Sequence, residues 1–317
     1  MEAKTSTLVL VRSLDELFDR RQQHARDAAA GRETRVARGA YIKTPLWAQL
    51  GQRGQYLLRI RAVVATRRRS MVLSHWSAAA IHGLPVIGRW PTAVHVIVGP
   101  VSGGRSRNGV VKHALTLRDE DVVEVDGLLV TSVARTVLDM AISADPLTAV
   151  IAADRALLVD RFRRRPPLAS REDLVEAWNR AMPFRGHRRA EHVIEFGETR
   201  AESPLESVSR LNMWVIGCPR PVLQQSFSDA EGYIGDTDFF WPDLQLTGEA
   251  DGEIKYLDEE MRGGRSADQV VLDEKDREDR IRALRKGMTR WRWEVGVNPS
   301  ALRAHLVHAG LPMGRRW

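Results

Sequence analysis

Hydrophobic and polar positions in the first seventy residues predict two helices separated by a short hairpin. The stretch SLDELFDRRQQHARDAAAG begins with Ser13, a favourable N-cap residue, carries acidic residues in its first turn and ends at Gly31, as a helix would. Around Gly39, RETRVARGAYI alternates basic and apolar positions, which favours a two-stranded wing. QYLLRIRAVVATRRRS predicts a second helix that ends in three arginines. We therefore expect residues 1–70 to form a winged-helix-like unit.

The next ninety residues, 71–160, alternate between helix and strand signals. SHWSAAAIHGLPV predicts a short helix that starts at Ser74 and stops at Gly83. The runs AVHVIVGP, GVVKHALTL and GLLV favour strands, and a further helix is expected to open at Thr131 or Ser132. This segment is expected to be an α+β domain.

Residues 161–200 are predicted to be a helical linker region. The basic, proline-containing stretch RFRRRPPLAS suggests a hinge near 160–170, and its arginines are either solvated linker charge or DNA contacts. Two helix signals follow, and Ser170 with Asp173 has the spacing of a capping box.

The last segment, residues 201–317, predicts the element order α, β, β, β, α, β. SPLESVSRLNMWVIG opens with Ser203, Pro204 and Glu206, a strong helix start. RPVLQQSFS, YIGDTDFFW and LQLTGEAD are strand-like, ADQVVLDEKDREDRIRALRKG is helical in length and composition, and MTRWRWEV resembles a final strand. The fold class expected for the whole chain is α/β (α+β), with a mixed C-terminal sheet flanked by helices.

Length, composition and charge narrow the functional classes. A chain of 317 residues is long enough for more than one core. No apolar run is long enough for a membrane span and the start does not resemble a secretory signal, so we expect a cytoplasmic protein without membrane contacts. The single cysteine, Cys218, excludes a disulfide within the chain. Net charge is +10 in residues 1–100, +1 in 101–200 and −4 in 201–317, so the basic character belongs to the N-terminal third.

Carboxylates at the ends of two predicted strands suggest a metal site. Asp238 lies near the end of one strand and Glu249 near the end of the next, and Glu249 and Asp251 share a face because they are two apart. These three residues could hold Mg²⁺, or Mn²⁺, which takes carboxylate oxygens and can activate water for phosphodiester hydrolysis; Glu206 could supply a fourth carboxylate. The alternative is a turn with solvated charge.

Basic residues of the N-terminal unit are candidate phosphate contacts for double-stranded DNA. They lie around the predicted wing and at the end of the second helix: Arg32, Arg35, Arg38, Lys43, Arg67, Arg68 and Arg69. The alternative is an ordinary solvated face. His75 and His82, seven apart on one helical face, are either metal ligands or packing residues, and packing is favoured because no third ligand is near in the sequence.

Four segments, RGAYI, SHWSAAAIHGLPV, VHVIV and VTSVARTVLDMA, resemble in their order the actinobacterial proteins grouped with the AbiEi family of type IV antitoxins and transcriptional regulators. The resemblance covers roughly residues 10 to 160. It implies DNA binding through an N-terminal winged helix, and a cognate toxin as a partner where the antitoxin role applies.

SPLESVSR, GDTDFFWPDLQLTGEADGEIKY and EKDREDRIRALRKGMTRWRW resemble the very-short-patch-repair-like endonuclease domains of the PD-(D/E)xK type. This resemblance covers about residues 200 to 297. It implies a metal-dependent DNA endonuclease, but Asp251 stands where the pattern has lysine, so Lys255 is the candidate for the missing positive charge and Lys275 a weaker one. Two functions therefore stay open: an active endonuclease domain, or a lapsed scaffold used for DNA or protein contacts.

Overall fold

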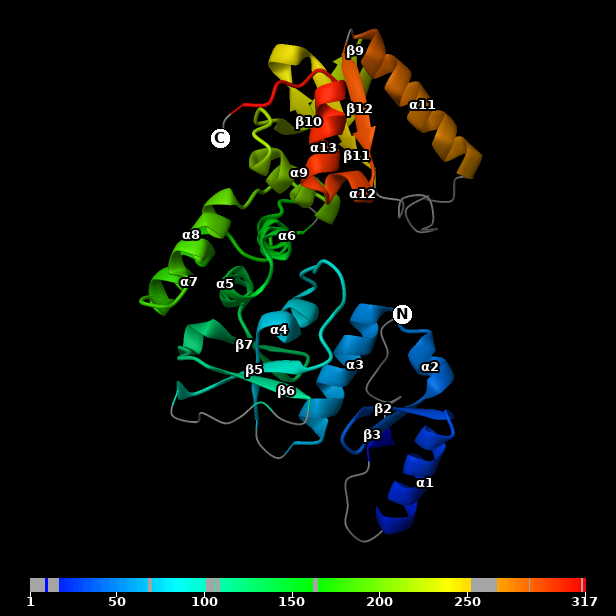
Figure 1. The fold of residues 1–317 in the computed structure, drawn as a ribbon, viewed down its shortest axis with the longest axis vertical. Helices are drawn as coiled ribbons and strands as arrows, with labels where there is room; N and C mark the ends of the chain where they lie inside the picture. Colours follow the sequence, from blue (N-terminus) through cyan, green and yellow to red (C-terminus); the bar gives the residue numbers. More distant parts are fainter. Residues whose placement is uncertain are drawn as a thin grey trace. The chain divides into compact units, whose positions relative to one another are not determined.

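The chain folds into two compact units of mixed helix and sheet, which confirms the expected α/β class. The computed structural model describes residues 9–10, 17–67, 70–100, 106, 109–161, 165–251, 267–284, 286–314 and 316–317. Unit 1 comprises Met1–Leu157 and Pro167–Phe196, and unit 2 comprises Leu158–Pro166 and Gly197–Trp317 (Figure 1). Within the described residues, no helix has the length and apolar character required to cross a membrane.

Unit 1 begins with a three-stranded antiparallel sheet and three helices. The sheet has the order β1-β3-β2, with β1 at Val9–Leu10, β2 at Glu33–Ala37 and β3 at Ala40–Lys43. The helices are α1 at Leu17–Ala29, α2 at Thr44–Ala48 and α3 at Gln52–Ala65. The predicted wing is the β2–β3 hairpin, whose turn contains Gly39 at φ +75°, a conformation that glycine adopts without steric cost. The proposed N-cap Ser13 lies outside the described residues, and α2 was not predicted.

Helix α3 joins the wing to the rest of unit 1 because it is buried on two sides. Leu58 and Ala62 pack in the small core of the hairpin. Tyr56, Ile60 and Val63 pack in a second core with the strands that follow. A helix with apolar residues on both faces must be covered on both faces, so the wing and the next sheet form one folding unit.

That next sheet has five strands in the order β6-β5-β4-β8-β7. Their bounds are β4 at Val72–Leu73, β5 at Val94–Val98, β6 at Val110–Ala114, β7 at Val122–Val125 and β8 at Leu128–Thr131, with the short 3₁₀ helix η3 at Asp119–Asp121 before β7. The β5–β6 and β4–β8 pairs are parallel, and the β4–β5 and β7–β8 pairs are antiparallel. Strands β5, β6 and β8 were predicted, whereas β4 and β7 were not.

Five further helices of unit 1 lie among the described residues, and the side chains of Ser132 and Ser170 cap two of them. They are α4 at His75–His82, α5 at Val133–Ser143, α6 at Pro146–Leu157, α7 at Arg171–Ala181 and α8 at His187–Phe196. Gly83 ends α4 at φ +73°, and the Ser132 hydroxyl accepts the Arg135 N–H at 3.2 Å at the start of α5. Ser170 and Asp173 form the predicted capping box of α7. These helices share one apolar core.

Unit 2 has the predicted order α, β, β, β, α, β. Its elements are α9 at Pro204–Val215, β9 at Val222–Asp229, β10 at Gly232–Trp241, the 3₁₀ helix η4 at Pro242–Leu244, β11 at Leu246–Ala250, α11 at Ala267–Ala283 and β12 at Gly287–Trp291, followed by α12 at Trp293–Gly296 and α13 at Pro299–His308. The sheet order is β12-β11-β10-β9. Only the β11–β12 pair is parallel, so the sheet is mixed as expected.

Candidate functional site

The register of unit 2 brings two of the predicted carboxylates together. Phe239 of β10 pairs with Gly248 of β11 in an antiparallel ladder, and continuing that register by one residue sets Asp238 opposite Glu249. Asp238 Oδ2 accepts the backbone N–H of Ala250 at 2.8 Å. Residues 235, 237 and 239 of β10 are buried, so alternation turns Asp238 to the opposite, half-buried face.

Glu206 joins this pair from the first turn of α9. The Ser203 hydroxyl caps the helix by accepting the Glu206 N–H at 3.2 Å, which fixes the residue at the helix start. Glu206 is only 4% exposed, and its Oε2 accepts the Glu202 N–H at 3.0 Å. Gln224 links the carboxylates, since its Nε2 lies 3.0 Å from Glu206 Oε2 and 3.4 Å from Asp238 Oδ1.

Burial and mutual repulsion perturb these carboxylates. Burial, reinforced by the neighbouring Asp238 charge, raises the pKa of Glu206 to about 8. Burial also raises the pKa of Glu249, with Asp238 again adding to the effect while Arg277 opposes it. Acidic groups that lie close enough to disfavour one another's ionisation would be stabilised by a cation.

Two arginines that the sequence did not single out contact Glu249. Arg277 of α11 donates from Nη2 to Glu249 Oε1 at 2.5 Å and from Nη1 to the Asp236 carbonyl at 2.9 Å. Its chain lies against Gly235, where an added Cβ would come within 3.1 Å of Arg277 Cδ. Arg290 of β12 lies 3.4 Å from Glu249 Oε2. Glu249 is therefore neutralised from two elements that are distant in the sequence.

The other residues predicted for this site are Asp251, Lys255 and Lys275. The Asp251 carboxylate is 29% exposed and lies 3.9 Å from Arg290 Nη1, so Glu249 and Asp251 both face Arg290 as strand alternation requires. Lys275 is exposed on α11. Lys255 lies outside the described residues.

The side chains of Glu206, Asp238 and Glu249 offer only carboxylate oxygens, which are the ligands that hard cations such as Mg²⁺ prefer. Among the residues described, however, no three His, Cys, Asp or Glu side chains form a ready group of metal ligands. Glu249 is turned to Arg277 and Arg290, so it would have to exchange an arginine for a cation before joining a coordination sphere.

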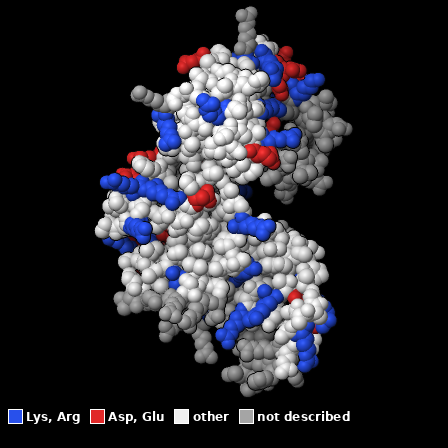
Figure 2. Space-filling model, viewed as in Figure 1, with Lys and Arg blue, Asp and Glu red and all other residues white. Residues whose placement is uncertain are grey.

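The predicted DNA-contacting residues of unit 1 lie on its surface. Arg35, Arg38, Lys43 and Arg67 are exposed, whereas Arg68 and Arg69 lie outside the described residues. Arg32 is also exposed but pairs with Asp27 through its Nε at 2.8 Å. Basic side chains outnumber acidic ones over the N-terminal elements on the face shown in Figure 2. These residues offer positive charge that a phosphate backbone could contact.

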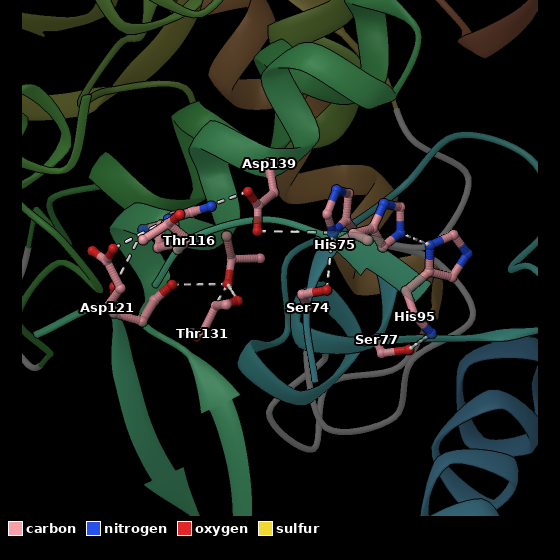
Figure 3. A network of polar contacts seen from close by, with 12 residues as sticks. Ser74, His75, Ser77, His95, Thr116, Asp121, Thr131 and Asp139 are labelled. Carbon is pink, nitrogen blue, oxygen red and sulfur yellow. Dashed lines mark hydrogen bonds and ion pairs between the residues drawn. The ribbon is translucent and has the colours of Figure 1, made fainter. Parts of the chain in front are cut away.

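The two histidines weighed as ligands take part in different contacts. His82 Nε2 lies 2.7 Å from the Thr131 carbonyl. His75 is buried, with Nδ1 2.9 Å from the Ser74 hydroxyl, and stacks on His113 at a ring-centroid distance of 3.5 Å (Figure 3). His113 Nε2 lies 3.0 Å from His95 Nδ1. No sequence pattern indicates that His75, His95 and His113 meet, because they lie on three separate elements.

Comparison with known proteins gives relatives without a known activity. No family model matches the chain. Two uncharacterized proteins of Mycobacterium tuberculosis, from strain CDC 1551 / Oshkosh and from strain ATCC 25618 / H37Rv, are each 26% identical to it over 217 residues, which is 68% of this chain and 76% of the relative. The chain is thus similar to mycobacterial proteins over most of its length.

Proposed function

We propose that the protein is a DNA-binding protein of the AbiEi antitoxin or regulator type whose unit 2 is a metal-dependent endonuclease-like domain. The observation that carries the proposal is the gathering of Glu206, Asp238 and Glu249 from three elements of an αβββαβ core. Double-stranded DNA is the proposed partner, which implies the cytoplasm as its location. The antitoxin role would add a cognate toxin.

The residues of unit 2 divide into anionic and cationic groups with different tasks. Glu206, Asp238 and Glu249 would hold Mg²⁺ or Mn²⁺, which when bound polarises a phosphoryl oxygen and lowers the pKa of water. Gln224 keeps Glu206 and Asp238 in fixed orientation through its amide. Arg277, once released from Glu249, would bring positive charge to a phosphate, the task proposed from the sequence for Lys255.

A second candidate function is a lapsed scaffold that binds DNA or protein without cleavage. The contacts of Glu249 with Arg277 and Arg290 favour it, because an arginine pair already supplies the charge that a cation would bring. Fold alone does not distinguish the two functions, since a nuclease-like core can persist after its chemistry has been lost.

Nicking of supercoiled plasmid by the full-length protein separates these candidates. We expect nicking with Mg²⁺ or Mn²⁺ and none in excess EDTA. Asp238→Asn and Glu249→Gln should lower the rate by at least about 100-fold because each removes an anionic ligand, while duplex binding stays unchanged. Asp243→Asn is the matched control, since Asp243 is an exposed residue of η4.

Three outcomes contradict the endonuclease proposal. Cleavage that survives EDTA, or cleavage that is intact in Asp238→Asn, would show that the carboxylates are not responsible for it. A protein that binds duplex DNA and never cuts it with either metal would establish the scaffold function instead.

Phosphate contacts of unit 1 are tested by salt dependence. Affinity for a duplex should fall steeply as salt rises, and the slope should become shallower in Arg35→Gln and Arg38→Gln because each removes one phosphate contact. Arg89→Gln removes an exposed arginine of the same unit outside the proposed surface and should leave the slope unchanged. Binding that is flat with salt would contradict the proposal.

A further inference from the structure

Unit 1 contains a cavity that the proposed DNA and nuclease functions do not use. Its volume is about 650 Å³, within the range of small-molecule sites. The cavity is bounded by the end of β6 and the segment that leads to η3, by one face of α5, and by the end of α7 with the loop to α8. All of these elements belong to unit 1.

One wall of the cavity carries a buried guanidinium in a fixed position. Arg135 of α5 is only 4% exposed. Its Nε donates to Asp139 Oδ1 at 3.0 Å, and its Nη1 donates to the Thr116 carbonyl at 3.2 Å and to Asp121 Oδ2 at 3.1 Å (Figure 3). Three acceptors thus hold the side chain in one orientation at the cavity wall.

A second guanidinium is held by the same buried carboxylate. Asp121 is 2% exposed, and its Oδ1 accepts from Arg180 Nη2 at 3.2 Å and Nε at 3.4 Å. Asp121 therefore fixes two arginines from α5 and α7 at the cavity. Arg180 Nη1 also lies 3.6 Å from Glu176 Oε2, but that side chain is 70% exposed, so the pair is largely screened by solvent. A planar guanidinium in a fixed position is well suited to binding a carboxylate or phosphate.

The rim adds positive charge that the described part of the chain does not neutralise. Arg118 and Arg185 both line the cavity and are exposed, and neither side chain has a hydrogen-bond or ion-pair partner among the described residues. The lining thus contains four arginines against two acids, Asp121 and Asp139. An anion is the complementary charge.

The remaining lining is largely apolar. Leu115, Leu138, Ile142, Met182 and Phe184 contribute side chains to the cavity. Burying a hydrophobic group against such a surface is favourable in proportion to the area removed from water. A bare inorganic anion would leave this surface unused.

We propose that the cavity binds a small organic anion, with its carboxylate or phosphate at Arg180 and Arg185 and an apolar ring or chain against Leu138, Ile142 and Phe184. The site is distinct in its elements from the proposed phosphate contacts on the wing. A protein with DNA-binding and ligand-binding surfaces in one folding unit could respond to a metabolite.

Calorimetric titration of the full-length protein with phenyl phosphate, benzoate and inorganic phosphate tests the proposal. At least one aromatic anion should bind saturably with one site per chain, and at least about tenfold more tightly than inorganic phosphate because only the aromatic probes bury a ring. Arg180→Gln and Arg185→Gln should each weaken that binding by about tenfold or more, since each removes a charged donor.

Two further variants show whether the loss of binding comes from the cavity itself. One removes a charge elsewhere, and the other changes the cavity without changing any charge. Arg188→Gln removes an exposed arginine of α8 outside the cavity lining and should bind like wild type. Ala114→Trp keeps every charge and adds an indole at the exposed end of β6, where Ala114 lines the cavity. It should take up part of the space and weaken binding by about tenfold or more while the circular dichroism spectrum stays native.

The proposal is overturned if neither aromatic anion binds, if inorganic phosphate binds as tightly as both, or if Arg188→Gln weakens binding as much as Arg185→Gln does. Unchanged binding in a folded Ala114→Trp protein would likewise show that the ligand lies elsewhere.

Discussion

Acid should destabilise unit 1 through its buried histidine cluster. His75 is 1% exposed and His95 is 8% exposed. Burial, followed by the nearness of His113 and His95, lowers the pKa of His75 to about 2, and burial with the neighbouring His113 lowers that of His95 to about 4. Both imidazoles are therefore neutral in the folded protein at pH values where exposed histidines take up a proton.

The direction and size of the effect follow from proton linkage. A folded-state pKa below the ordinary value of about 6.5 means that stability is fully present above pH 6.5 and is lost as pH falls, since the unfolded chain binds protons that the folded chain cannot. Between pH 7 and pH 5 each histidine should cost roughly 2 kcal/mol, and the pair roughly 4 kcal/mol. Burial raises the pKa of Asp139, whose carboxylate lies 3.8 Å from His75 Nδ1, to about 6. Its proton uptake in the folded protein offsets roughly 1 kcal/mol of this cost, which leaves roughly 3 kcal/mol. That is a large part of the 5–15 kcal/mol of a typical domain, taken as an order of magnitude.

Hydrogen exchange in increasing urea measures the pH dependence of unit 1 stability in the full-length chain, because peptides from β5 and α5 report on unit 1 alone. We expect the free energy of opening, corrected for intrinsic exchange, to fall by about 3 kcal/mol from pH 7 to pH 5. His75→Asn should reduce that fall by about 2 kcal/mol, since one titrating group is gone. Asparagine also tolerates the positive φ of 51° at this position.

The matched control is His192→Asn, because the His192 side chain is 78% exposed on α8 of the same unit. It should keep the full pH dependence of wild type. A wild-type fall below about 1 kcal/mol between the two pH values, or an identical fall in His75→Asn, would refute the reasoning from burial.

Three other substitutions test contacts that support the two units. Gly217→Ala should destabilise unit 2 by about 2–5 kcal/mol in urea, since Gly217 has φ +72° and an added Cβ would lie 2.2 Å from the Gly314 carbonyl oxygen. An unchanged midpoint of urea unfolding would contradict this close approach. Tyr56→Phe should cost unit 1 about 1–3 kcal/mol because the buried hydroxyl lies 2.8 Å from Ser77 Oγ and donates to the Ala93 carbonyl at 3.0 Å. A neutral result would contradict a contribution of these two hydrogen bonds to stability. Ser170→Ala should cost about 1 kcal/mol through loss of the capping box. This loss should be measurable as faster amide hydrogen exchange in the first turn of α7. Exchange protection equal to wild type in that turn would argue against the cap.

Local chemistry allowed much of the secondary structure to be predicted. The caps at Ser132, Ser170 and Ser203 and the stop at Gly83 bond or turn the backbone within four residues, so the sequence alone contains both partners. The same holds for the α, β, β, β, α, β order of unit 2, whose alternating and helical periods are local patterns. Alternation also predicted that Glu249 and Asp251 share a face.

The sites depended on contacts between distant residues, which only the tertiary structure decided. Gln224 and Arg277 have no sequence pattern that marks them, and they meet Glu206 and Glu249 through strand pairing and the packing of α11. The cavity arises because Asp121 orients arginines that lie 14 and 59 positions away. Local patterns fix which residues share a helix or a strand face, but register and packing fix which faces meet, because burial of apolar area is a property of the whole fold.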